Sequence, residues 1–412
     1  MRKLALYCLA SSVLLLAACE EKKVEPRPVP PTPVADVAGP ADAAVAAVAV
    51  AAPVEAGEIL IGEVGSISGA EATFGDSTHK GIELALKQIN SKGGIKGRQL
   101  RVKVLDDQGR PEEAATAMTR LIDGDKVVLV LGEVASTRSI AMAAVAENHK
   151  VPMISHASTN PKVTDGNNYV FRVCFIDPFQ GYVMAKFARE TLKISKVAIL
   201  KDVRNDYSIG LAAAFVARFK GMGGKIVKEE AYSAGDKDFK AQLASIKAAE
   251  PDAIYVPGYY ADVGLVARQS KRMGMNVPLL GGDGWSSEKL YEIGGEAIEG
   301  SYYSNHYSTQ DPSPRIQEFV AEYKQAYGGE PDCFAALGYD AARVAANAIA
   351  RAKSLSGDDL RDAVAQTKDF DGVTGMITID AKHNATKPAV VLKVEGGKSV
   401  YQTTVAPENS RP

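Results

Sequence analysis

The sequence predicts an α/β fold built as two Rossmann-like lobes from a discontinuous chain. Between residues 58 and 406, short strand-like apolar runs alternate with helical segments that carry apolar residues on one face, and this alternation restarts after Asp177. Such a β-α-β rhythm is typical of parallel sheets covered by helices on both faces. A body of this length is long for one domain and fits two.

The elements follow from hydrophobic periodicity. Residues 80–91 are typical of the helices, because Ile82, Leu86 and Ile89 fall on one side. In the first unit we expect strands at 59–64, 100–105, 127–131 and 151–155, and helices at 80–91, 112–123 and 136–149. In the second unit we expect strands at 197–201, 225–232, 253–257 and 279–281, the last closing the second sheet, and helices at 210–222, 239–249 and 261–273.

A third stretch of chain returns to complete both lobes. We expect helices at 314–327, 335–352 and 358–366, and strands at 376–379 and 389–393. The expected boundaries are 58–176 plus 307–385 for lobe 1, 177–306 plus 386–406 for lobe 2, and a tail at 407–412. Ligands of open α/β sheets bind outside the carboxyl ends of the strands, which here means the cleft between the lobes.

The N-terminus predicts export. Arg2 and Lys3 precede an apolar run that is too short to span a bilayer, as in a signal peptide covering residues 1–18. The run ends in Leu16-Ala17-Ala18-Cys19, which resembles the lipobox of bacterial lipoproteins, and an ordinary signal peptide that happens to contain a cysteine is the alternative. The lipobox implies lipidation of Cys19, hence an anchor on the outer, periplasmic side of a membrane.

Residues 19–57 have the composition of a tether. Prolines are scattered among alanine and valine, and no aromatic residue occurs in the stretch. Such a segment buries too little surface to fold, so we expect a disordered, semi-stiff linker between the lipidated cysteine and the folded body.

Composition excludes several function classes. A net charge of −2 gives no electrostatic reason to expect nucleic acid. After Cys8 and Cys19 only Cys174 and Cys333 remain, and no Cys/His spacing suggests a metal, so we expect neither metal nor cofactor. The sequence has no Walker A motif, no G-x-G-x-x-G spacing and no G-x-S-x-G elbow, which favours a binding protein over an enzyme.

Motifs occur along the whole body, in the segments 69–81, 89–97, 106–107, 132–136, 155–159, 257–260 and 281–285. In their order and spacing they resemble the leucine/isoleucine/valine-binding proteins of ABC transporters. The resemblance implies the type I periplasmic-binding-protein (Venus-flytrap) architecture, a monomer, a free amino acid as ligand, and permease and ATPase subunits as partners. A two-lobed sensing or regulatory lipoprotein is the alternative.

The resemblance assigns the polar part of the cleft. Ser136 and Thr159 match residues that hold the ligand carboxylate, and the start of a helix at Ser136 suits an anion independently of the family. The Ala157 carbonyl, Thr159 and Asp283 match the groups that hold the ammonium, with Asp283 standing where the family often has Glu. By local pattern alone, Ser136 would be a helix cap and Thr159 and Asp283 turn residues.

Aromatic residues are expected to surround the ligand side chain, because rings provide large apolar area with few torsions to freeze. The matches are Phe74, Tyr207, Tyr259, Phe334 and Trp285, the last of these also a place where specificity can diverge. A disulfide that some family members carry is absent, since the matching positions are Gly109 and Ala135. Pairing of Cys174 and Cys333 stays open.

Overall fold

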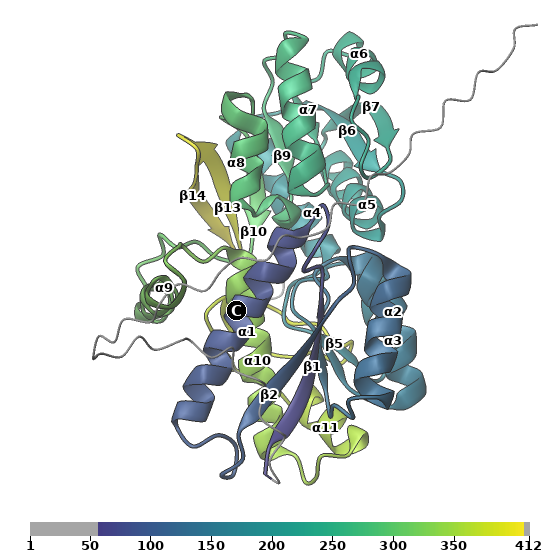
Figure 1. Cartoon of the computed structure of the whole chain (residues 1–412). Coiled ribbons are helices and arrows are strands. Elements are labelled where there is room, and N and C mark those ends of the chain that lie inside the picture. Colours follow the sequence, from purple (N-terminus) through teal and green to yellow (C-terminus); the bar gives the residue numbers. More distant parts are fainter. Residues whose placement is uncertain (1–56, 408–412) are drawn as a thin grey trace, which may run out of the picture. The chain divides into compact units, whose positions relative to one another are not determined.

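Two sheets, each with its own helices, organise residues 57–407, which are the residues described by the computed structural model (Figure 1). The sheet of lobe 1 has the order β2-β1-β3-β4-β5, and all its pairs are parallel. Its strands are β1 (Ile59–Gly65), β2 (Leu100–Asp106), β3 (Val130–Leu131), β4 (Met153–Ser155) and β5 (Val170–Arg172).

Helices cover both faces of this sheet. On one side α1 packs along α10, with α9 against α1 and α11 against α10, while α2 and α3 pack together on the other side (Figure 1). Right-handed crossovers require this division, because the chain moves one way from β1 to β2 and back the other way to β3. The bounds are α1 (Ala72–Ser91), α2 (Pro111–Asp123), α3 (Ser136–His149), α9 (Pro314–Tyr327), α10 (Cys333–Arg351) and α11 (Gly357–Ala365).

The sheet of lobe 2 has the order β14-β13-β10-β9-β8-β6-β7, with β13 and β14 antiparallel to their neighbours and the other pairs parallel. Its strands are β6 (Lys196–Asp202), β7 (Lys225–Tyr232), β8 (Ala253–Tyr255), β9 (Leu279–Gly281), β10 (Tyr302–Asn305), β13 (Ala389–Glu395) and β14 (Lys398–Val405). Its helices are α4 (Asp177–Lys186), α5 (Asp206–Gly221), α6 (Lys240–Ala248), α7 (Tyr260–Arg272) and α8 (Glu288–Gly294), with short helical turns η2 (Phe187–Thr191), η3 (Asp283–Trp285) and η4 (Gly295–Ala297). The turn η1 (Pro161–Val163) lies between β4 and β5 of lobe 1.

The chain passes between the two sheets three times: after β5, after β10, and before β13. The two-lobed α/β fold is therefore as predicted, and the residue at which each lobe begins stays a prediction. None of the helices in residues 57–407 combines the length and the apolar character needed to cross a membrane. Residues 1–56 and 408–412, with Cys19 and the expected signal peptide and tether, lie outside the described range.

Helix α1 begins at Ala72, eight positions before the Lys80 expected from periodicity. Two glycines in the first half of α1 are needed for close packing. A Cβ at Gly75 would lie 2.3 Å from the Ser66 carbonyl oxygen, and one at Gly81 would lie 2.0 Å from the Ala335 carbonyl oxygen. The prediction that the helix starts at Lys80 was wrong because tertiary packing outweighs the poor helix propensity of glycine.

Several other expectations need correction. The second sheet does not close at 279–281, because β10, β13 and β14 extend it. The strand expected at 376–379 joins neither large sheet, since β12 (Gly375–Ile377) pairs only with β11 (Phe370–Gly372). Helices α4 and α8 and the strands β5, β10 and β14 were not predicted. Strand β14 has the mixed, largely exposed pattern of an edge strand, so its sequence lacks an apolar run.

Candidate functional site

The start of α3 forms one corner of the cleft. Ser136 is the first residue of the helix, so its N–H and that of Thr137 have no partner within the helix. The Ser136 hydroxyl oxygen accepts from the Asn160 N–H at 3.2 Å, which leaves the hydroxyl proton available to a ligand. Thr159 is fully buried, and its hydroxyl makes no hydrogen bond of good geometry, although the Asp177 carboxyl lies within reach of it. This corner therefore presents unused donors, an arrangement suited to an anion.

The loop after β4 is held rigid by its own polar contacts. The Ser155 hydroxyl accepts from the Ser158 N–H at 2.9 Å and donates to the Glu133 carbonyl at 2.9 Å. Arg172, buried at the end of β5, donates to the carbonyls of Ser158 and Asn160. Ala157 and Thr159 lie between these fixed points. Sequence reasoning missed Arg172, although an arginine inside an apolar strand was a visible signal.

Asp283 forms the opposite corner, in η3 directly after β9. The carboxylate is 2% exposed. Its Oδ1 accepts from Gln180 Nε2 at 2.7 Å and from the Tyr207 hydroxyl at 2.9 Å, and its Oδ2 accepts from His306 Nε2 at 3.0 Å. Burial lowers the pKa of His306 to about 4, so this partner is neutral at pH 7.

A buried carboxylate with only neutral partners is unusual, because buried charges are normally paired. Within residues 57–407 no lysine or arginine pairs with Asp283. A carboxylate has about four acceptor positions, and three are used here. The corner therefore holds an uncompensated negative charge with one acceptor position left for a cation.

The glycines on either side of Asp283 are required by this arrangement. A Cβ at Gly282 would lie 2.5 Å from the Tyr207 hydroxyl and 2.9 Å from Gln180 Nε2, the two donors to the carboxylate. A Cβ at Gly284 would lie 2.8 Å from a ring carbon of Tyr259. Glycine, Asp283 and glycine thus form part of a packed site, and the local pattern typical of an exposed turn was a misleading signal.

Four of the five predicted aromatic residues form one cluster that spans both lobes. Phe74 of α1 meets the ring of Tyr259 edge-on at 5.3 Å between centroids, and it lies 4.5 Å from the Phe334 ring at the start of α10. Tyr207 stacks on Tyr259 at 5.3 Å. Tyr207 connects the apolar cluster to the polar corner, because its hydroxyl is the donor to Asp283.

Trp285 is placed differently. Its indole is fully buried, its Nε1 donates to the Val256 carbonyl at 3.0 Å, and its ring packs against Gly281 and Tyr303. These contacts belong to the core of lobe 2, and none of them joins Trp285 to the other four rings. Its role in the ligand pocket stays a prediction without support from these contacts.

Direct hydrogen bonds cross the cleft beside the cluster. The Thr137 hydroxyl accepts from the Asp206 N–H at 2.9 Å, Asn160 Nδ2 donates to the Asp206 carbonyl at 2.7 Å, and the Tyr260 hydroxyl donates to the Ala70 carbonyl at 2.8 Å. Each bond joins a residue of one lobe to a residue of the other. The structure therefore shows the lobes in contact, with the predicted site residues between them and almost fully buried.

A buried ion network supports the same region from lobe 1, and sequence reasoning missed it. Arg138 contacts Glu71 at 2.6 Å and Glu133 at 3.0 Å, and its Nη1 donates to the Gly109 carbonyl at 3.1 Å. These carboxylates hold the pKa of Arg138 well above its usual range despite burial. The guanidinium is thus occupied by the protein itself and acts as a structural support.

The two cysteines of the folded body form neither a disulfide nor a reactive site. Cys174 and Cys333 are both free and buried. Burial raises the pKa of the Cys174 thiol to about 12, so the group stays protonated. Among residues 57–407 no cluster of histidine, cysteine and acidic side chains is arranged to hold a metal ion.

Two α/β lobes that meet across a buried interface lined by polar and aromatic residues, with a chain that crosses three times, define a two-lobed solute-binding protein. Comparison with known proteins agrees. Residues 58–398 match the family model described as periplasmic binding protein. The chain belongs to this family, and within it to the substrate-binding proteins of branched-chain amino acid ABC transporters.

Individual relatives support the assignment. A Leu/Ile/Val-binding protein homolog of Brucella melitensis is 32% identical over 349 residues, covering 83% of this chain and 93% of that protein. Among solved structures, the leucine-binding protein LivK of Thermotoga maritima is 40% identical with a TM-score of 0.82, covering 85% of this chain and 99% of its own. The protein LivJ of Streptococcus pneumoniae, in complex with isoleucine, is 36% identical with a TM-score of 0.81 and corresponding coverages of 85% and 100%. These relatives are binding proteins, and the chain is not an enzyme.

Proposed function

We propose that this protein binds a small amino acid, branched-chain or otherwise hydrophobic, between its lobes and delivers it to an ABC transporter. The observation that carries the proposal is the buried Asp283 carboxylate, which has three neutral donors and no cationic partner among the described residues. A ligand ammonium would supply the missing charge, and a charge-assisted hydrogen bond is roughly twice as strong as a neutral one.

The rest of the zwitterion fits the opposite corner. We assign the ligand carboxylate to the hydroxyls of Ser136 and Thr159 and to the free N–H groups at the start of α3. The carbonyl of Ala157 and the Thr159 hydroxyl complete the ammonium site with Asp283. Burying both ligand charges requires partners at both ends, and each lobe supplies one set.

The aromatic cluster defined by Phe74, Tyr207, Tyr259 and Phe334 is assigned to the ligand side chain. Its rings come from both lobes, so an aliphatic group placed among them is enclosed only when the lobes meet. Isoleucine in the Streptococcus pneumoniae relative supports an aliphatic ligand for this chain.

Calorimetry on the purified protein tests the ligand. We expect leucine, isoleucine and valine to bind, and 4-methylpentanoate, which is leucine without its amino group, to bind at least thirtyfold more weakly. If 4-methylpentanoate binds as tightly as leucine, the ammonium site is wrong and the protein is a receptor for carboxylic acids.

We also propose that the protein is a lipoprotein held by Cys19 at the extracytoplasmic face of a membrane, where it acts on the permease and ATPase. The support is the sequence Leu16-Ala17-Ala18-Cys19 after an apolar run. Expressed in a bacterial host, the protein should incorporate labelled fatty acid and fractionate with membranes, and Cys19→Ser should abolish both. Label retained in Cys19→Ser contradicts the anchor without affecting the proposed ligand.

A further inference from the structure

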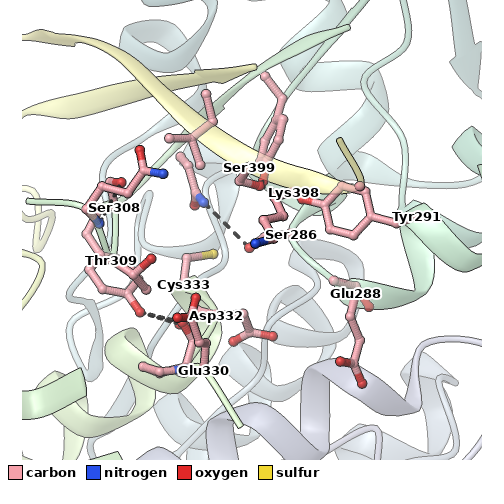
Figure 2. A pocket seen from close by; sticks show the side chains of 18 residues that line it. Ser286, Glu288, Tyr291, Ser308, Thr309, Glu330, Asp332, Cys333, Lys398 and Ser399 are labelled. Atoms are coloured by element: carbon pink, nitrogen blue, oxygen red, sulfur yellow. Dashed lines mark hydrogen bonds between the residues drawn. The ribbon is translucent and has the colours of Figure 1, made fainter. Parts of the chain in front are cut away.

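A hollow of about 560 Å³ lies beside the proposed amino-acid site and shares none of its residues (Figure 2). We call it the hinge pocket. Lobe 2 contributes the start of α8 and the edge strand β14, lobe 1 contributes the loop before α10, and the crossing segment after β10 forms part of the wall. A molecule in the hinge pocket would therefore touch both lobes and the segment that joins them.

The lining is rich in hydroxyl groups. Eight of its side chains carry a hydroxyl and two carry an amide. A hydroxyl both donates and accepts, as do the hydroxyls of a sugar or polyol, so the two sets of groups are matched. Three of the eight are tyrosines, whose ring faces are suited to the C–H faces of such molecules.

Part of this lining is fixed by the protein, and part is free. The hydroxyls of Tyr291 and Tyr303 both bond to the Ser399 hydroxyl, and the Tyr307 hydroxyl donates to the Pro331 carbonyl at 2.6 Å. By contrast, the Ser308 oxygen accepts from the Gln310 N–H at 3.2 Å, and its proton remains free. Fixed walls with free donors are the features of a preorganised polar site.

The charges restrict the ligand. Glu288, Glu330 and Asp332 line the hinge pocket, and among residues 57–407 Lys398 is the one cationic side chain in its lining. Glu330 is paired with Lys324 at 2.7 Å, while Asp332 accepts from the Ser77 hydroxyl at 2.7 Å and from the Ala335 N–H at 2.9 Å. An anion would face this excess of carboxylates, and an apolar molecule would leave the free hydroxyl proton of Ser308 without an acceptor.

Cys333 also lines the hinge pocket, but its thiol is unreactive. It is 1% exposed, and its sulfur points into the hinge pocket (Figure 2). Burial raises the pKa of the thiol well above its usual range, so it is neither a nucleophile nor a metal ligand at neutral pH.

We propose that the hinge pocket is a second binding site, for a small polyhydroxylated molecule such as a free sugar or polyol without negative charge. The proposal does not depend on which solute occupies the cleft. It rests on a hollow large enough for a hexose, hydroxyl groups on α8, on β14 and on the crossing segment after β10, and the carboxylates of Glu288, Glu330 and Asp332 in its lining.

Titration calorimetry and ligand-observed saturation-transfer NMR test it with D-glucose, myo-inositol, D-glucosamine and, as the anionic counterpart, D-gluconate. We expect at least one of the first three to bind, and gluconate to bind at least tenfold more weakly than glucose. Thr309→Trp fills the mouth and should weaken binding at least tenfold. Thr116→Trp, on the exposed face of α2, is the matched control and should bind as the wild type does.

Gln310→Ala provides a second variant that removes the amide, whose Oε1 accepts from the Tyr401 N–H of β14 at 2.9 Å, and it should weaken binding severalfold. Thermal midpoints of the variants verify folding independently of any ligand. The proposal is overturned if none of the neutral or amino compounds binds to the wild type, if gluconate binds best, or if folded Thr309→Trp and Gln310→Ala both bind as the wild type does.

Discussion

The two polar corners of the cleft are built in opposite ways. In lobe 2, Asp283 is a full charge held by three hydrogen bonds of 2.7–3.0 Å from neutral groups. In lobe 1, Ser136 and Thr159 are neutral, and the Thr159 hydroxyl makes no hydrogen bond of good geometry. One corner is thus a fixed charge that lacks a counter-ion, and the other is a set of open dipoles that lack an acceptor.

Because of this difference, the two corners should contribute different amounts to the free energy of ligand binding. A carboxylate left in a buried site without a cation keeps its full desolvation cost, whereas an unused hydroxyl costs far less. The charge should therefore dominate affinity, and the dipoles should refine it. Because the corners lie on different lobes, a zwitterion satisfies both only when the lobes meet, which links binding to closure.

The largest expected effect is that of Asp283→Ala. Removing one partner of a desolvated charge pair costs about 2–5 kcal/mol, or roughly thirtyfold to several thousandfold in Kd. Every amino acid ligand should be affected alike, because the ammonium is common to all of them. Calorimetry with leucine, isoleucine and valine measures the loss.

The matched control is 4-methylpentanoate, whose weak binding should change little in Asp283→Ala because it has no ammonium to lose. Asp283→Ala also leaves three donors without an acceptor, which can lower stability. Thermal unfolding of the variant and of the wild type measures that loss separately from the loss of affinity. Leucine binding at wild-type strength would mean that Asp283 is structural, and the amino-acid assignment would lose its main support.

The sequence predicted the lobes because the β-α-β rhythm depends on local periodicity, which survives without knowledge of contacts. It also singled out Asp283, Thr159 and the aromatic cluster through the family resemblance. It could not show that Gln180 and His306 hold Asp283, since these residues lie 103 and 23 positions away from it and meet it only through the fold. The first turns of α1 were missed for a related reason, because Gly75 there packs against the Ser66 carbonyl, a contact that local periodicity does not record.

A smaller effect is expected from Thr159→Val, which removes the hydroxyl and keeps the shape. A hydrogen bond to a charged group contributes about 1.5–3 kcal/mol, so leucine should bind roughly tenfold to a hundredfold more weakly. Stability should fall little, because the hydroxyl makes no hydrogen bond of good geometry in the protein and only lies within reach of the Asp177 carboxyl. Chemical denaturation checks this second expectation.

Ser136→Ala is the comparison variant, because that hydroxyl also accepts from the Asn160 N–H. It should lose both affinity and about 1 kcal/mol of stability. If Thr159→Val destabilises the protein as Ser136→Ala does, the Thr159 hydroxyl has a structural partner, and the contrast between the two corners is weaker than proposed.

Phe74→Leu should have a weaker effect of another kind. It keeps an apolar side chain but shortens its contact with Tyr259 and Phe334, so affinity should change by about 1 kcal/mol, or roughly fivefold. The order of preference among valine, leucine and isoleucine should shift, in contrast to the uniform loss in Asp283→Ala. A uniform loss in Phe74→Leu would place this ring outside the side-chain pocket.

The smallest expected effect is that of pH between 5 and 7. An ordinary histidine titrates near 6.5, but burial lowers the pKa of His306 to about 4, so it stays a neutral donor to Asp283 throughout this range. Burial also moves the pKa of Asp177 and that of Lys387 to about 8, which keeps the first protonated and the second charged below pH 7. Leucine keeps both its charges, so Kd should vary less than twofold.

Below pH 5, protonation of the unpartnered Nδ1 of His306 would give Asp283 a cation inside the protein, and leucine should bind more weakly. His306→Gln, which keeps an N–H donor but cannot titrate, should remove that acid loss. A fall in affinity centred near pH 6.5 in the wild type, absent in His306→Gln, would show that His306 is charged beside Asp283 at neutral pH, and the corner would then be a closed ion pair with no place for an ammonium.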